Sequence, residues 1–221
     1  GGTDMTRDAF HQELREIEES VIQMAALVES AIARAMQALV RRDALLAEEV
    51  VTDDGTVNEL QRSIRNRTIS VMARQAPVAR DLRELSTVQL VINELERMGD
   101  HAVGIAKNAQ RLLMQEPLPT TGDLSEMAKL VREQVRAGIQ AFVDVNVQAA
   151  RDICEKDDEI DHQYRAIFTE LLDRMAKDPA TVPAATSLLF VAHDLERIGD
   201  RVTNICEDVI YMVTGEIEEL N

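Results

Sequence analysis

Two acidic pairs with identical spacing recur along the chain. Glu96 and Asp100 are four residues apart, as are Glu196 and Asp200, and the two pairs are offset by 100 residues. Residues four apart share one face of a helix, where two like charges destabilise it by roughly 0.2–0.5 kcal/mol. A bound cation would reverse that effect, because carboxylate oxygens are natural ligands for divalent metal ions. We therefore expect these four residues to ligate metal, the alternative being a solvated acidic face.

Polar residues one predicted helix earlier offer further oxygen ligands. Asp54 and Asn58 would complete a site with the first pair, and Asp157 and Asp161 a site with the second. Asn58 brings a neutral carbonyl oxygen where its counterpart brings a carboxylate, so the first site is expected to be the weaker or smaller one. The alternative is an acidic first turn that stabilises a helix dipole.

These residues must be positioned by helices, because apolar residues recur throughout at alternating steps of three and four. All five prolines lie where this pattern pauses. Asp123 to Glu126 resembles a capping box opening the fourth helix, and Asp178 before Pro179 reads as an N-cap at the start of the sixth. We predict helices near residues 5–41, 44–74, 78–114, 123–150, 154–177 and 179–214.

The helical pattern occurs twice along the chain, as an internal repeat. Residues 93–100 align with residues 193–200, and the apolar stripes around them keep the same offset. The predicted fold class is all-α, with two tandem three-helix bundles forming an internal pseudo-repeat. The units are predicted at 5–114 and 123–215, with a linker at 115–122.

The predicted direction of the acids argues against a catalytic centre. If Leu195 and Ile198 face the core, Glu196 and Asp200 turn away from it, so the sites lie on the outside of each bundle. Ferritin-like oxidases project their ligands inward, with a Glu-x-x-His on each of two helices. Here Glu159-x-x-His162 occurs once, without a counterpart. No Ser-His-Asp pattern, phosphate-binding glycine loop or nucleophile elbow is present, and we expect no enzyme.

Composition narrows the class of protein further. The chain has 24 Lys and Arg against 40 Asp and Glu, a net charge of −16, which disfavours direct binding to nucleic acid or to anionic membranes. No apolar run approaches the roughly 18 residues of a membrane span, and no secretory signal is apparent. Cys154 and Cys206 fit a reducing compartment as small core residues. We expect a soluble, cytoplasmic protein.

The paired motifs resemble one known family. Leu95–His101 and Leu195–Glu207 look like the double signature of PhoU, the accessory regulator of bacterial phosphate transport, and Arg80-Asp-Leu-Arg83 also matches. The resemblance spans about Ala9 to Gly215, in the family's order of two three-helix units.

This resemblance implies a cytoplasmic, often dimeric six-helix protein that carries a divalent or multinuclear metal (Fe, Zn, Mn or Mg) on its surface. It implies a negative regulator of phosphate uptake and of the phosphate-starvation (Pho regulon) response. The partners would be the ATP-binding subunit of the phosphate ABC transporter and the phosphate-sensing histidine kinase, which would hold the protein peripherally at the inner membrane. Arg80 and Arg83 would be partner contacts. By motif match the metal ligands would be Glu96, Asp100, Glu196, Asp200, Asp54, Asn58, Asp157 and Asp161.

The first unit departs from the family pattern. It has Gly104 and Lys107 where the second unit has Asn204 and Glu207, and Asn58 replaces an expected Asp. A related group acts beside a non-ABC phosphate transporter, and the sequence does not separate the two groups. Two further alternatives stay open: a carboxylate-bridged metalloenzyme, and a metal-free helical scaffold, in which neutralising the acids would leave stability unchanged or slightly improved.

Overall fold

The computed structural model describes residues 2–119 and 121–220, and the side chains within those ranges except at 2–8, 121 and 122. Thr120, in the predicted linker, lies outside the described residues. In the described ranges the chain forms α-helices and one 3-10 turn, without strands. The elements in order are α1 (Gly2–Arg41), α2 (Ala44–Gln75), α3 (Ala79–Leu112), α4 (Thr121–Val143), α5 (Val147–Lys177), the 3-10 turn η1 (Pro179–Thr181) and α6 (Val182–Thr214).

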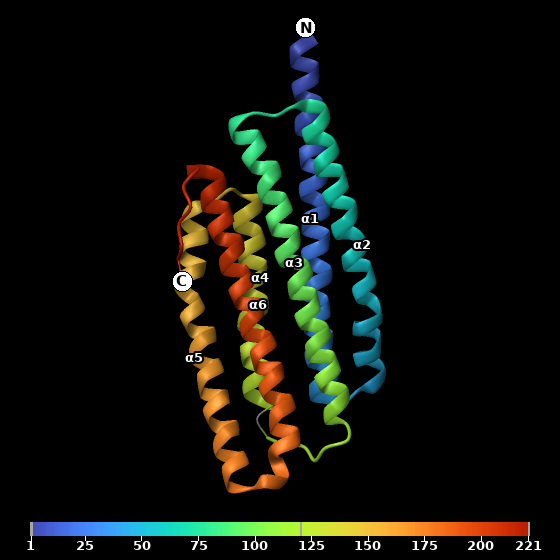
Figure 1. Cartoon of the computed structure of the whole chain (residues 1–221), viewed down its shortest axis with the longest axis vertical. Coiled ribbons are helices and arrows are strands. Elements are labelled where there is room, and N and C mark those ends of the chain that lie inside the picture. The colour runs from blue at the N-terminus through green and yellow to red at the C-terminus, as the bar shows by residue number, and fades with distance from the viewer. Residues whose placement is uncertain (1, 120, 221) are drawn as a thin grey trace.

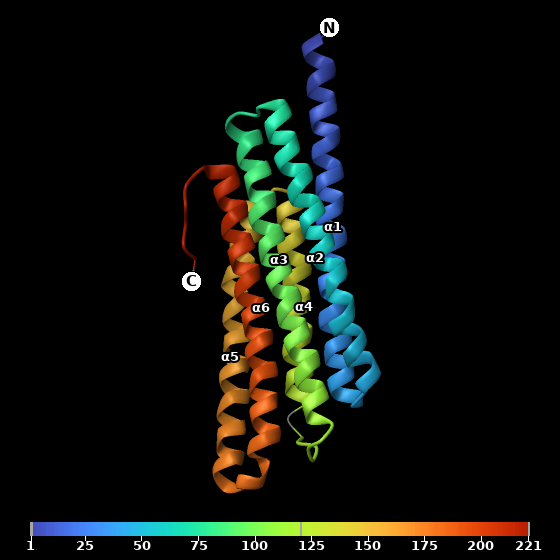
Figure 2. The same cartoon turned by 45° about the vertical axis from the view of Figure 1, so that its right-hand side comes forward.

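The helices lie side by side in one elongated bundle (Figures 1 and 2). Helix α2 packs on α1 and α3 at one edge, and α5 packs on α4 and α6 at the other. The two units meet in the middle through α3 against α6 and α1 against α4, and α3 and α6 run in opposite directions. No helix in the described ranges has the length and apolar character needed to cross a bilayer. The predicted fold class, two three-helix bundles, is confirmed.

An aliphatic core runs along the middle helices. Every apolar residue of the predicted α3 stripe, from Val88 to Leu112, is buried, as is every one of the α6 stripe from Leu188 to Met212. Burial of aliphatic side chains at about 25 cal/mol per Å² is the main stabilising term for such a bundle. The 3.6-residue period therefore identified the helix faces that hold the bundle together.

The turn between the first and second helices is built alike in the two units. Asp43 caps α2 by accepting hydrogen bonds from the backbone N–H groups of Leu45 and Leu46, and Asn146 caps α5 by accepting one from Ala149. The preceding residues, Arg42 and Val145, both adopt a left-handed backbone, with φ of 55° and 53°. The predicted fourth helix at 123–150 was therefore too long, because this capped turn ends α4 at Val143 and starts α5 at Val147.

Two other predicted helix starts differ from the structure. Helix α4 begins at Thr121, which places Asp123 inside its first turn and not at the N-cap, so the predicted capping box is wrong. Asp178 does act as an N-cap, accepting from the N–H of Ala180, and Pro179 follows at N1. The segment that they open is the 3-10 turn η1, and α6 itself begins at Val182, three residues later than predicted.

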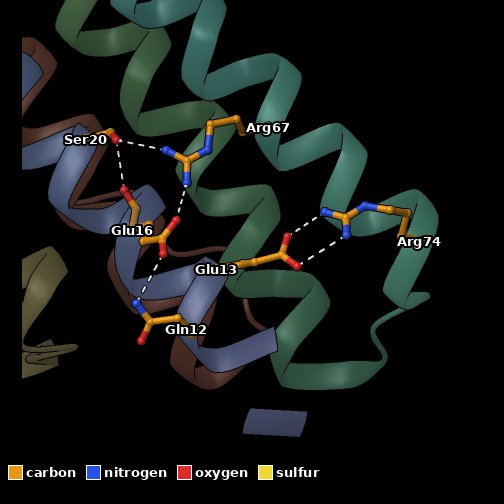
Figure 3. A network of polar contacts seen from close by, with 6 residues as sticks. All are labelled: Gln12, Glu13, Glu16, Ser20, Arg67 and Arg74. Atoms are coloured by element: carbon orange, nitrogen blue, oxygen red, sulfur yellow. Dashed lines mark hydrogen bonds and ion pairs between the residues drawn. The ribbon is translucent and has the colours of Figure 1, made fainter. Parts of the chain in front are cut away.

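The outer helices hold their charges differently. Arg67 and Arg74 of α2 bind Glu16 and Glu13 of α1 at 3.0 and 2.6 Å (Figure 3). Along α5, by contrast, three ion pairs among the described residues connect positions four apart within the helix, as for Arg174 and Glu170, and Arg151 pairs with Glu218 in the segment after α6. Exposed pairs of either kind contribute about 0–1 kcal/mol, so both helices depend chiefly on their apolar faces.

Candidate functional site

The fold brings the predicted ligands together as two clusters. Helices α2 and α3 supply the first acidic cluster, and α5 and α6 supply the second. The first acidic cluster is Asp54, Asn58, Glu96 and Asp100; the second acidic cluster is Asp157, Asp161, Glu196 and Asp200. Burial raises the pKa of Asp54 and of Asp200, and repulsion from a neighbouring carboxylate, Asp100 in the first cluster and Asp161 in the second, raises each further.

In both units a glycine of the middle helix leaves room for the leading acid, the first that the outer helix contributes to the cluster, which is Asp54 in the first cluster and Asp157 in the second. A Cβ atom on Gly99 would lie 3.2 Å from Asp54 Oδ1, and one on Gly199 would lie 3.2 Å from Asp157 Oδ1. Glycine costs a helix interior about 1 kcal/mol relative to alanine. Its presence at both equivalent positions is explained by the close packing of an acidic side chain from the neighbouring helix.

The second acidic cluster is the more deeply buried one. Asp157 is only 7% exposed and accepts a hydrogen bond of 2.9 Å from Gln134 Nε2 of α4. Burial raises the pKa of Asp157, with further increases from Asp161 and Asp200, while Gln134 opposes the shift. Burial and the charge of Asp200 raise the pKa of Glu196 to about 6. This cluster therefore concentrates negative charge where solvent screens it poorly.

A cleft gives solvent access to the second acidic cluster. It has a volume of about 760 Å³ and runs between α5 and α6. The four acids of the cluster line it together with Arg151, Arg197, Arg201 and Leu220. Arg197 Nη1 donates to Asp200 Oδ2 at 2.7 Å, as expected for an arginine that pairs with a neighbouring acid. The acids thus face an open space large enough for ions and their water ligands.

The first acidic cluster carries less negative charge. Asn58 Nδ2 donates to Asp54 Oδ2 at 2.9 Å, so the amide points its nitrogen at the acid in this arrangement. Burial and Asp100 raise the pKa of Asp54, and Lys107 opposes this shift. Burial likewise raises the pKa of Glu96, against the opposing charges of Arg97 and Arg65. The negative charge of the first acidic cluster is therefore reduced twice, by Asn58 in place of a carboxylate and by the neighbouring cations.

The donor chemistry of both clusters fits a hard, oxygen-seeking cation. Among the residues that the structure describes, no three His, Cys, Asp or Glu side chains stand arranged to hold an ion in their present conformations. Instead, Gln134, Asn58 and Arg197 bind oxygens of the acids. Ligation would require Arg197 to rotate away from Asp200, which a long side chain beside an open cleft can do at modest cost.

The predicted outward direction of the acids needs one refinement. Glu196 and Asp200 do turn away from the apolar stripe of α6, but α5 covers them in part, and their side chains are 20% and 28% exposed. The second acidic cluster therefore lies in a cleft between α5 and α6 and not on an open convex surface. Glu159 and His162, considered for an inward-facing oxidase site, are both exposed on α5.

Two contacts between acidic and basic side chains of α3 and α6 were missed by sequence reasoning. His101 Nδ1 of α3 lies 2.9 Å from Asp194 Oδ1 of α6, and Arg201 Nη1 of α6 lies 3.5 Å from Glu94 Oε2 of α3. The pairs are reciprocal, because Glu94 aligns with Asp194 and His101 with Arg201 in the repeat. An acid seven residues before a basic residue in both copies was the signal that could have revealed them.

The departures at Gly104 and Asn204 also belong to this contact between units. Asn204 Nδ2 donates to Glu94 Oε2 at 3.1 Å, and a Cβ atom on Gly104 would lie 2.5 Å from Asp194 Oδ2. Gly104 therefore makes room for an acid of the other unit and does not alter the first acidic cluster. Lys107, in contrast, does act on that cluster through Asp54.

The two arginines predicted to contact a partner have different surroundings. Arg83 Nε donates to the carbonyl oxygen of Met212 at 3.1 Å, near the C-terminal end of α6, where a cation is favoured by the helix dipole. This contact explains why α3 carries a cation so near its start. Arg80 is exposed at the beginning of the same helix.

Comparison with known proteins places these features in a family. The PhoU domain matches residues 21–109 and 124–209. A relative from Clostridium acetobutylicum, named a phosphate-specific transport system accessory protein PhoU homolog, is 38% identical over 218 residues, covering 98% of this chain and all of its own. One of the same name from Caulobacter vibrioides is 37% identical, covering 97% and 94%.

Solved structures agree with this match. The crystal structure of the phosphate transport system regulatory protein PhoU from Streptococcus pneumoniae superposes with a TM-score of 0.89 at 32% identity, covering 95% of this chain and 99% of that one. PhoU from Pseudomonas aeruginosa gives 0.88 at 30% identity, covering 94% and 100%. These relatives are named as accessory or regulatory proteins, which confirms the expectation that the chain is not an enzyme.

Proposed function

The chain belongs to the PhoU family, and from this membership we propose that it is an accessory, regulatory protein of a phosphate-specific transport system. The observation that carries the proposal is the nearly complete, collinear match to relatives bearing that role in their names. Both acidic clusters, with their opposing glycines, lie inside the matched ranges.

We further propose that the regulation is negative and acts through protein contacts. The partners would be the ATP-binding subunit of the phosphate ABC transporter and the phosphate-sensing histidine kinase, met at the cytoplasmic face of the membrane. A net charge of −16 supports an indirect effect on transcription, since a protein of that charge is repelled by DNA. Arg80, exposed at the start of α3, is the better candidate for a partner contact, because Arg83 is engaged with α6.

Metal binding at the two acidic clusters is the second part of the proposal. Asp157 and Asp161 of α5 would hold a divalent cation together with Glu196 and Asp200 of α6, and the first acidic cluster would hold another more weakly. A cation of this kind (Fe, Zn, Mn or Mg) supplies positive charge that neutralises the gathered carboxylates.

The protein's own residues prepare this binding. Gln134 orients Asp157 from the core side, and Gly199 leaves room for the acid against α6. Arg197 occupies Asp200 without an ion and would swing into the open cleft when one binds. Because the ligands come from two helices, ion binding would fasten α5 to α6, which suits a role in bracing a surface that partners recognise.

Metal content of the untagged protein tests the ligand assignment. We would compare the wild type with Asp100→Ala, Asp200→Ala and the double variant by inductively coupled plasma mass spectrometry. Asp173→Ala, an exposed acid of α5 outside both clusters, is the matched control. We expect bound metal that Asp200→Ala reduces more than Asp100→Ala does. A metal-free wild type of normal helicity would overturn the metal proposal and leave the regulatory one standing.

Phosphate uptake tests the regulatory proposal separately. In cells lacking the native gene, we expect uptake of radiolabelled phosphate and expression of phosphate-starvation genes to rise, and this chain to restore both. The transporter's ATP-binding subunit should co-purify with it from phosphate-replete cells. Unchanged uptake and gene expression in the deletion strain would contradict the proposal, whatever the metal content.

A further inference from the structure

A pair of thiols lies directly behind the second acidic cluster. Cys154 of α5 and Cys206 of α6 are the only cysteines in the sequence, and both are free. The two thiols lie next to each other, and a hydrogen bond between them is the largest cause of the pKa shift of each. Because α5 packs directly on α6, two neighbouring cysteines on these helices can approach each other to form a disulfide.

The two thiols differ in their access to solvent. Cys154 is 8% exposed and lines the 760 Å³ cleft, whereas Cys206 is completely buried behind it. A small solute that enters the cleft can therefore reach Cys154 but not Cys206. This arrangement provides one attacking thiol and one resolving thiol, as in other oxidation-sensitive pairs.

Packing alone does not require cysteine at these positions. In the repeat, Cys154 aligns with Val51 and Cys206 with Ala106, and in the first unit Val51 is partly buried and Ala106 fully buried. The same place between an outer and a middle helix is thus filled by ordinary apolar residues in one unit and by two touching thiols in the other. The difference is chemical and not steric.

We propose that Cys154 and Cys206 form a peroxide-oxidisable pair whose disulfide joins α5 to α6 beside the second acidic cluster. This proposal does not depend on metal binding or on the transport function. Disulfides in reducing compartments are usually transient and redox-sensing, which is the role that the location of this pair suits.

The oxidation balances with a neutral hydroperoxide as the oxidant. The sulfur of Cys154, as thiolate, attacks one peroxide oxygen; the O–O bond breaks, and hydroxide leaves and takes up the thiol proton as water. Cys206 then attacks the sulfenic sulfur of Cys154; the S–S bond forms, the S–O bond breaks, and the departing hydroxide leaves as water with the proton of Cys206. Two thiols lose two electrons, and hydrogen peroxide is reduced to two water molecules.

The residues around the two thiols determine which oxidants can reach them and which thiol reacts first. Glu207 and Asp157 act on both thiols, so anionic disulfides such as oxidised glutathione are repelled from the cleft while hydrogen peroxide is not. The hydrogen bond between the two thiols lowers the pKa of Cys154, whereas that bond and burial raise the pKa of Cys206. Because Cys154 lines the cleft and Cys206 is completely buried, Cys154 is the thiol that reacts first.

Intact-mass spectrometry of the native full-length protein tests the proposal. After hydrogen peroxide treatment, the protein is denatured and alkylated. We expect a monomer that has lost the mass of two hydrogen atoms, with both alkylation sites gone and restored by a reductant. Oxidised glutathione at equal concentration should act more slowly. Two thiols that remain alkylatable, a sulfinic acid at Cys154, or disulfide-linked dimers would overturn the proposal.

Variants assign the two roles. Cys154→Val/Cys206→Ala copies the packing of the first unit, so it should keep native helicity and show no peroxide-dependent mass change. In Cys206→Ser, a dione probe should label Cys154 as sulfenic acid, whereas Cys154→Ser should give no label. Labelling of Cys206 in Cys154→Ser, without labelling in Cys206→Ser, would overturn the assigned order of attack. The wild-type measurement stands even if a variant fails to fold.

Discussion

The two acidic clusters share one scaffold and differ in charge. Each is built by an outer and a middle helix, each outer helix begins at an Asp or Asn cap after a left-handed residue, and each middle helix offers a glycine to the leading acid. Only the second cluster keeps four carboxylates. The first has Asn58 in place of one, with Lys107 acting on Asp54 and Arg65 on Glu96.

The side chains around the two clusters also make the first cluster less negative than the second. Lys107 aligns with Glu207 and Arg65 with Phe168, so the first unit gains cations where the second has an acid or an exposed aromatic ring. Backbone features that place the acids are therefore retained in both copies, while the charges that determine cation affinity are not. Affinity at such a site depends on local charge more than on the helices that carry it.

Replacing each of the two glycines by valine should lower the free energy of unfolding more at the second cluster than at the first. We expect Gly199→Val to lower the free energy of unfolding by about 3 kcal/mol, because the new side chain meets Asp157, Gln134 and Ile160 in a packed region. Gly99→Val should cost about 1 kcal/mol, since Asp54 is less buried and can move aside. Urea unfolding followed by circular dichroism measures both. Equal losses would show that the clusters are packed equally tightly.

Exchanging the residue that distinguishes the clusters should exchange their cation affinities. Asp161→Asn gives the second cluster the composition of the first, and we expect it to weaken Mn²⁺ binding there by about tenfold to a hundredfold, because one carboxylate is lost. Asn58→Asp should strengthen binding at the first cluster by a smaller factor, since Lys107 remains. Isothermal titration calorimetry distinguishes the sites. An unchanged affinity in Asp161→Asn would remove that residue from the ligand set.

The two units also differ at the aligned positions Asp208 and Asn108, and this difference should make stability depend on pH. Burial, with the charges of Glu94 and Glu207, raises the pKa of Asp208 to about 7, and the first unit has Asn108 at the equivalent position. Because the pKa of Asp208 is higher in the folded state, the unfolded chain ionises first, so Asp208 costs stability progressively as pH rises from about 4 to 7. Asp208→Asn should gain about 1–2 kcal/mol over the wild type at pH 8 and nothing at pH 4. Urea midpoints at both pH values measure this, and a pH-independent difference would contradict it.

The smallest effect concerns how the outer helices are held. Arg74→Ala removes the ion pair between α2 and Glu13 of α1 (Figure 3), and we expect a loss of about 0.5 kcal/mol that disappears in high salt. Arg174→Ala removes a pair within α5 and should cost still less, because no second helix is involved. Thermal unfolding at low and high salt separates the two. A salt-independent loss in Arg74→Ala would indicate packing by its aliphatic stem.

Helical periodicity and the internal repeat predicted the fold class and the buried stripes of α3 and α6. They succeeded because both depend on spacing, which a sequence records directly. The repeat would also have corrected the one large boundary error. Asn146 aligns with the cap Asp43 at the same offset of 103 residues that relates Asp157 to Asp54, so the break between α4 and α5 was readable.

Burial and pairing across the units were harder to predict. Gln134 occupies a polar position on an otherwise apolar stripe of α4, and only the packed structure shows that it reaches Asp157. His101 and Asp194 are 93 residues apart, and their contact depends on how α3 crosses α6. Such contacts follow from the rigid placement of helices, which periodicity within one helix does not specify.

The reciprocal pairs between α3 and α6 have a consequence for how this molecule can evolve. His101 with Asp194 and Arg201 with Glu94 form a self-complementary, isologous contact, the arrangement that relates two identical subunits about a two-fold axis. In a homodimer every substitution appears twice, so both copies of a site would lose a carboxylate together. Joining the copies in one chain removes that restriction: one half can exchange Asp for Asn, or Val for Cys, while the other half keeps the ancestral residue.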